Sequence, residues 1–330
     1  MAAASHAYRR ARVEVAGGRS TVGVWEPVAP PPGPVPTVCA IHGITSNHLF
    51  LAGLVAALPG VRVIAPDLRG RAGSRHLGAP YGMRAHARDV LAAVEALAGP
   101  GEVTLVGHSL GGFVAMTLAG LADGDLAVAE HRFRGLVLVD GGLPRPPRPP
   151  RAADAADPAT ADAADPADRL AAVGPAARLS MVFDGVEEYL DFFRAHPAFA
   201  DGVDPVAAES FRYDLVADDA GGFRASTAVE AMQADSDDVY GAPDFGLGVE
   251  RVMGDPARRR DVHLIVAEGD LVAARPGLHP AGILADYRRR WPGVRITEVA
   301  GTNHYDILLA RRGIRVCAEA VLAALGPDRA

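Results

Sequence analysis

A serine of the chain lies between two glycines, in the run GHSLG at residues 107–111. A serine hydroxyl attacks carbonyl carbon when a neighbouring base accepts its proton, so Ser109 is a candidate nucleophile for acyl chemistry. An apolar run precedes the serine and a helical pattern follows it, a context typical of a nucleophile elbow. Glycines are needed on both sides because larger side chains would collide with the packed strand and helix. The motif predicts a serine exposed at the edge of a sheet.

A serine nucleophile needs a base, and His304 is the candidate. It lies in the run AGTNHYD, after a predicted strand at residues 294–299 and before a predicted helix. None of the other ten histidines combines such a loop with this place late in the chain. We therefore expect His304 to take the proton of Ser109.

The base needs an acid that orients the imidazole and stabilises its charged form. Asp270 ends the run HLIVAEGD before His304 and is the preferred candidate. Glu268 in the same turn and Asp140 at the end of the run VLVD are alternatives. The order serine, aspartate, histidine along the chain is one of the known orders of a catalytic triad.

An oxyanion hole is expected in the run IHGITSN at residues 41–47, which follows an early predicted strand. Its donors would be the backbone N–H groups of Ile44 and Leu110, and such preorganised donors strongly stabilise the oxyanion. Gly43 lets the backbone turn close to a substrate. We expect His42 to form a hydrogen bond within the loop and to carry no proton in the reaction.

Three further side chains are expected to contact the substrate. They are His108 beside the nucleophile, Asn47 in the oxyanion loop and Tyr305 beside the base.

The elements that must position these residues alternate along the chain. Residues 11–16 and 20–25 predict a hairpin. Apolar runs then predict buried strands at 37–43, 61–67, 102–108, 133–140, 261–270 and 294–299. Helical patterns lie between or after them at 47–58, 82–98, 110–121, 281–290 and up to about residue 325. Such alternation predicts an α/β fold with a mostly parallel sheet that helices cover on both faces.

The alternation stops between the fourth and fifth of these buried strands. We expect residues 1–142 and 256–330 to form the core and residues 143–255 to form an inserted cap or lid. Within the insertion, residues 143–168 are rich in proline, alanine and aspartate and are expected to be flexible. The rest of it holds many of the aromatic residues of the chain.

Composition excludes several classes of function. The 33 basic residues are all arginine, so lysine Schiff bases and phosphate-loop lysines are excluded. A net charge of −7 argues against binding to nucleic acid or to an anionic membrane. The two cysteines, Cys39 and Cys317, lie in apolar runs and are predicted to be core residues. No metal-ligand spacing is present and no cofactor is expected. No apolar run suits a signal peptide or a membrane span, so we expect a cytoplasmic enzyme.

The elbow, the oxyanion loop and the histidine loop together make the chain resemble the α/β-hydrolase superfamily, as does the run APDLRG at residues 65–70. The resemblance covers residues 11–142 and 256–325. It implies an eight-stranded sheet, a Ser-His-Asp triad and a helical cap. Superfamily members that act on epoxides or haloalkanes use aspartate at the elbow, so Ser109 argues against both reactions.

The expected function is therefore hydrolysis of an ester or thioester of a small, hydrophobic substrate through an acyl-enzyme intermediate. Related reactions of the same triad, namely C–C bond hydrolysis, acyl transfer and cyclisation, are the alternative. A ligand-binding protein without turnover is a third hypothesis, because fold does not fix function.

Overall fold

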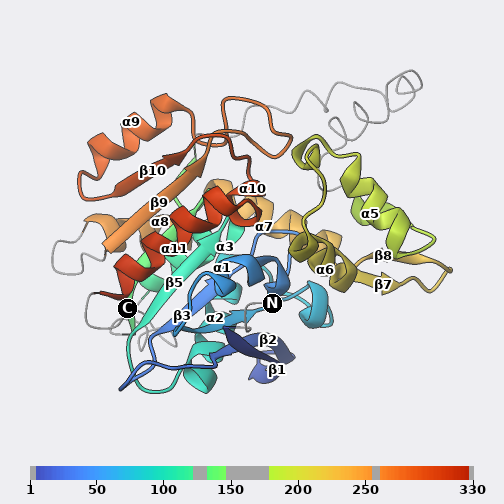
Figure 1. The fold of residues 1–330 in the computed structure, drawn as a ribbon, viewed down its shortest axis with the longest axis horizontal. Helices are drawn as coiled ribbons and strands as arrows, with labels where there is room; N and C mark the ends of the chain where they lie inside the picture. Colours follow the sequence, from blue (N-terminus) through green and yellow to red (C-terminus); the bar gives the residue numbers. More distant parts are fainter. Residues whose placement is uncertain (1–4, 122–131, 146–177, 255–260, 327–330) are drawn as a thin grey trace.

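A computed structural model describes residues 5–121, 132–145, 178–254 and 261–326 (Figure 1). Its centre is an eight-stranded sheet with the order β1-β2-β4-β3-β5-β6-β9-β10. The strands are β1 His6–Val15, β2 Gly18–Pro27, β3 Thr37–Ile41, β4 Arg62–Pro66, β5 Val103–His108, β6 Phe133–Val139, β9 Asp261–Ala267 and β10 Arg295–Val299. The strands from β4 to β10 in this order run parallel, whereas β1 and β2 form an antiparallel hairpin that joins β4. The predicted mostly parallel, eight-stranded α/β sheet is confirmed.

Both faces of the sheet are buried, which explains why its central strands read as continuous apolar runs. In β3, Cys39 and Ile41 belong to one core cluster, and Val38 and Ala40 belong to the other. On the first face, buried side chains of α2 Met83–Leu97, α3 Leu110–Gly120 and α9 Ala281–Arg290 pack into the cluster. On the second face, buried side chains of α1 Ala52–Ala56, α10 Asp306–Leu309 and α11 Arg311–Leu325 do so. Cys39 and Cys317 are free and buried, as predicted.

One expected helix is shorter than its pattern suggested. Residues 47–58 form a 3₁₀ turn at His48–Leu51 and then α1 Ala52–Ala56. Asn47 caps this segment, because its side chain accepts a hydrogen bond from the amide of Leu49.

An insertion separates β6 from β9. Its described elements are α5 Val186–Arg194, α6 Pro205–Asp214, β7 Leu215–Ala217, β8 Phe223–Ala225, α7 Val229–Gly241 and α8 Pro243–Val249. Figure 1 shows α5, α6, β7 and β8 to one side of the sheet. Aromatic side chains pack these elements together; the Phe193 and Phe211 rings stack with centroids 3.5 Å apart. The segment expected to be flexible lies outside the described residues from residue 146 onward, and the division of core from cap at 142 and 256 stays a prediction.

Helix α8 packs closely on α3. The Phe113 and Phe245 rings lie 5.0 Å apart, and a Cβ atom on Gly120 would come within 2.3 Å of the Gly248 backbone. The two helices therefore approach to a distance that leaves no room for a side chain at residue 120.

We predict that Gly120→Ala lowers the free energy of unfolding by about 1–3 kcal/mol, because the added methyl forces α3 and α8 apart. Urea unfolding would measure the change. Gly246→Ala is the matched control, since a Cβ there meets no atom within 4 Å and should stabilise the exposed helix by up to about 1 kcal/mol. Equal effects of the two substitutions would contradict the close packing.

Candidate active site

Ser109 lies on a strained turn between β5 and α3. Its backbone has φ 54° and ψ −120°, a left-handed conformation that is uncommon for a residue other than glycine. The flanking glycines allow the turn. A Cβ on Gly107 would lie 2.2 Å from the Gly111 carbonyl oxygen, and one on Gly111 would lie 2.1 Å from that of Ile41. The side chain of Ser109 lines a cavity at the carboxyl ends of the parallel strands.

The predicted base, His304, lines the same cavity and is paired with an acid. It follows β10, and its Nδ1 donates a hydrogen bond of 2.6 Å to Oδ2 of Asp140, at the end of β6. Both residues are buried. Burial by itself raises the pKa of Asp140, but the hydrogen bond and the charge of His304 outweigh it and lower that pKa below its ordinary value. Asp140 is therefore an ionised acceptor that fixes the orientation of the imidazole.

The prediction that Asp270 pairs with His304 is wrong. The Asp270 carboxylate instead accepts hydrogen bonds from two amides of its own turn, at 2.9 and 2.8 Å, and Glu268 accepts one from Gly301. The Asp270 carboxylate is thus occupied within its own turn, whereas β6 pairs directly with β5, so its end lies beside the serine elbow that the histidine must reach. Asp140 stands there with φ 51°, and its second oxygen accepts from the amide of Ala267.

The two amides expected to form the oxyanion hole face no acceptor. Neither the N–H of Ile44 nor that of Leu110 donates to a described residue, and Leu110 begins α3, where amides lack a partner within the helix. The Gly43 carbonyl accepts from His42 Nδ1 at 2.8 Å and from the Ser46 amide at 3.2 Å. Because the peptide bond between Gly43 and Ile44 is trans, the N–H of Ile44 points away from these two donors. Ile44 and Leu110 both line the cavity.

His42 acts in the loop as a neutral donor. Its Nε2 accepts from the Leu68 amide at 3.0 Å, which leaves the proton on Nδ1 for the Gly43 carbonyl. Burial lowers the pKa of His42 to about 4. These contacts agree with the expectation that His42 forms a hydrogen bond within its loop.

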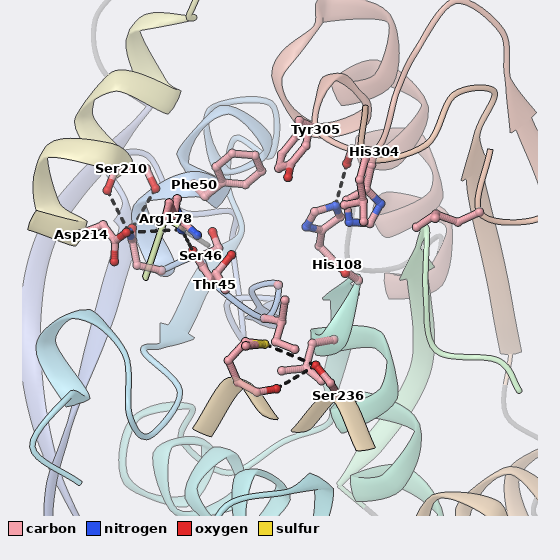
Figure 2. Close-up of a pocket in the computed structure, with 18 of the residues that line it drawn as sticks. Thr45, Ser46, Phe50, His108, Arg178, Ser210, Asp214, Ser236, His304 and Tyr305 are labelled. Carbon is pink, nitrogen blue, oxygen red and sulfur yellow. Dashed lines mark hydrogen bonds and ion pairs between the residues drawn. The ribbon is translucent and has the colours of Figure 1, made fainter. Parts of the chain in front are cut away.

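The cavity has a volume of about 270 Å³ and mixed walls (Figure 2). One wall is polar and carries Thr45, Ser46, Asn47 and Ser210. Much of the rest is aromatic or aliphatic and includes Phe50, Phe113, Phe192, Phe193, Phe199, Phe211, Leu271 and Leu278. A hydrophobic group can therefore be buried beside the serine.

All three residues expected to contact substrate line this cavity, but two of them also hold the site together. Asn47 Nδ2 donates to the Ser210 carbonyl at 2.9 Å, which ties the oxyanion loop to α6. His108 Nε2 donates to the His304 carbonyl at 2.9 Å, and burial lowers the pKa of His108 to about 3. The Tyr305 ring packs on Phe199, with centroids 5.1 Å apart.

Two arginines of the cavity, Arg145 and Arg178, were not predicted. Arg178 is buried; its Nη2 donates to the Thr45 carbonyl at 2.8 Å and lies 3.5 Å from the Asp214 carboxylate (Figure 2). Arg145 lies within the low-complexity part of the insertion and Arg178 follows it, and no periodicity there marks a residue as facing a site.

Metal binding and membrane spanning find no support in the described part of the chain. No group of histidine, cysteine, aspartate and glutamate in the described ranges could hold a metal ion. Of the helices among those residues, none is long and apolar enough to cross a bilayer.

Comparison with known proteins gives matches of two kinds. Residues 36–184 match the family described as alpha/beta hydrolase fold. Lipase LipV of Mycobacterium tuberculosis is 38% identical over 110 residues, which are 33% of this chain and 38% of that protein. The chain therefore spans well under half the length of the curated relatives it matches.

Solved structures match over nearly the whole chain. E-2-(acetamidomethylene)succinate hydrolase has a TM-score of 0.66 at 21% identity and covers 97% of this chain and 100% of its own. A thioesterase domain from the curacin biosynthetic pathway has a TM-score of 0.65 at 18% identity and covers 96% of this chain and 99% of its own. At these identities the likeness establishes the fold.

The pairing of His304 predicts that Asp140→Asn slows modification of Ser109 by a fluorophosphonate about 10³-fold or more, because the amide no longer fixes the required tautomer. The second-order labelling rate, followed by intact mass, would measure it. Asp270→Asn is the matched control and should label within about threefold of the wild type. A larger loss in Asp270→Asn than in Asp140→Asn would restore Asp270 as the partner.

Because burial keeps His42 neutral, the free energy of unfolding is predicted to depend on pH. Between pH 7 and pH 5 the unfolded chain binds a proton at this histidine, whose ordinary pKa is 6.5, whereas the folded chain, with its pKa at about 4, does not. The folded state therefore loses about 2 kcal/mol as the pH falls through that window. The variant His42→Asn should lose about 2 kcal/mol less than the wild type, as measured by urea unfolding at the two pH values. Equal losses would show that His42 is charged when folded.

Proposed function

Because residues 36–184 match the alpha/beta hydrolase family and the whole chain has that fold, we propose that it is a serine hydrolase that cleaves an ester or thioester of a small, hydrophobic substrate. One observation carries the proposal: the serine of a strained elbow and a histidine hydrogen-bonded to a buried aspartate line one cavity with two unpartnered amides. This set of groups contains each part that acyl transfer to serine requires.

In the proposed reaction, Ser109 Oγ attacks the carbonyl carbon of the substrate while His304 Nε2 accepts the hydroxyl proton. The imidazolium that forms donates from Nδ1 to Asp140, whose negative charge stabilises it. The carbonyl oxygen becomes an oxyanion and accepts hydrogen bonds from the Ile44 and Leu110 amides.

Collapse of this intermediate expels the alcohol or thiol, which receives the proton from His304, and leaves an acyl group on Ser109. Water then attacks the acyl-enzyme, with His304 again as the base, and releases the acid and the free serine.

The walls of the cavity support a substrate with an apolar group. Burial of a hydrocarbon or aromatic group against side chains such as Phe192, Phe199 and Leu271 contributes binding energy in proportion to the apolar area covered. A polar wall formed by the oxyanion loop orients the reacting carbonyl.

The test is intact mass after treatment with a fluorophosphonate probe, together with hydrolysis of an ester and thioester panel. We expect one adduct on the wild type, none on Ser109→Ala, and a loss of kcat of at least about 10⁴-fold in that variant. Ser236→Ala is the matched control, because Ser236 lines the same cavity and donates to the Met232 carbonyl, outside the triad. It should keep both labelling and turnover.

A folded wild type that neither labels nor hydrolyses any member of the panel would contradict the proposal and favour a ligand-binding protein. A labelled enzyme whose products are those of acyl transfer or C–C cleavage would keep the triad and change the reaction.

A further inference from the structure

Three fully charged side chains line the cavity among the described residues: Arg145, Arg178 and Asp214. Two of these charges face one another, since Arg178 Nη2 lies 3.5 Å from Asp214 Oδ2. Asp214 is further held by the hydroxyls of Tyr189 and Ser226, each at 2.6 Å. Asp214 thus compensates the charge of Arg178, and among the described residues that line the cavity no carboxylate is left to pair with the third charge.

That charge belongs to Arg145. Its Nε is buried and has no hydrogen-bond partner, and no hydrogen bond or ion pair within the described ranges involves its guanidinium. A buried guanidinium N–H without an acceptor is costly, so a ligand in the cavity that supplies an acceptor would gain binding energy there.

The backbone that carries Arg145 is firmly placed. The Pro144 carbonyl accepts from the Tyr287 hydroxyl at 2.8 Å. Two residues earlier, a Cβ on Gly142 would lie 2.8 Å from the Gly112 backbone, so the segment runs against the start of α3. The same segment begins at Asp140, the partner of His304. Arg145 is thus held on the cavity wall by the element that carries the triad acid.

We propose that the substrate carries a carboxylate in addition to its scissile ester or thioester, and that Arg145 binds this carboxylate. The planar guanidinium matches the two oxygens of a carboxylate, and its single positive charge matches a monoanion. The apolar walls suit a hydrocarbon spacer between the two groups. The inference rests on the proposed function, whose site it extends, and it assigns the substrate class as half-esters or half-thioesters of dicarboxylic acids.

The experiment compares two series of p-nitrophenyl esters of equal length. In one series the acyl chain ends in a carboxylate, as in the glutarate half-ester, and in the other it ends in a methyl, as in the valerate ester. The wild type should prefer the carboxylate series in kcat/KM. Arg145→Met should lower kcat/KM for the preferred half-ester roughly 10- to 100-fold and change that for its neutral counterpart by less than about threefold.

Two variants serve as controls. Arg145→Lys keeps the charge and should retain part of the preference. Arg134→Met removes an arginine that pairs with Glu102 on an exposed surface, and it should leave both series unchanged.

Two results would overturn the inference while the proposed function stands: a wild type that hydrolyses the neutral series equally well, or an Arg145→Met variant that loses both series in proportion. If the wild type labels with a fluorophosphonate but hydrolyses neither series, protection of Ser109 by valerate and by valeramide decides. Stronger protection by valerate that disappears in Arg145→Met supports the inference, and equal protection rejects it. Absence of labelling would instead contradict the proposed function, and the inference would fall with it.

Discussion

The hydrogen bond between His304 and Asp140 is the contact on which the rest of the site depends. It joins the loop after β10 to the end of β6, across the intervening strand β9. Parallel strands place their carboxyl ends on one edge of the sheet, and there the serine elbow after β5 is the next neighbour. The backbone strain at Ser109 and at Asp140 is tolerated because packed glycines and strand pairing fix both turns. The large apolar core therefore holds three loops, those after β5, β6 and β10, in fixed positions relative to one another.

The oxyanion loop is held differently, by buried charges that connect it to the insertion. Arg71 Nε donates to the Ile44 carbonyl at 2.9 Å, and Arg178 donates to the neighbouring Thr45 carbonyl at 2.8 Å. Each arginine also pairs with a carboxylate of the insertion, Arg71 with Asp235 and Arg178 with Asp214. Buried ion pairs contribute little net stability, but removal of one partner leaves an uncompensated charge. The inserted helices thus fix the loop geometry as well as cover the cavity.

Much of this architecture follows from the sequence, because each buried strand is an apolar run and each glycine of the elbow has a steric reason. The serine, the histidine and the two amides are marked by local motifs, and they line one cavity. The partner of the histidine is not marked locally. Asp140 and Asp270 both follow apolar strands, and only the strand order and the turn that closes on the Asp270 carboxylate distinguish them. Arg145 and Arg178 could not be predicted, since their roles depend on tertiary contacts around a segment without periodicity.

The histidines around the proposed base are neutral in the folded protein. The rings of His108 and His304 lie 4.7 Å apart, so a proton on His108 would repel the one that His304 gains in the proposed acyl transfer. Burial removes this conflict, because it lowers the pKa of His108 to about 3 while Nε2–H donates to the His304 carbonyl. His42 is kept neutral by burial in the same way. The site therefore surrounds its proposed base with imidazoles that supply hydrogen bonds without charge, and the negative charge of Asp140 acts on His304 unopposed by them.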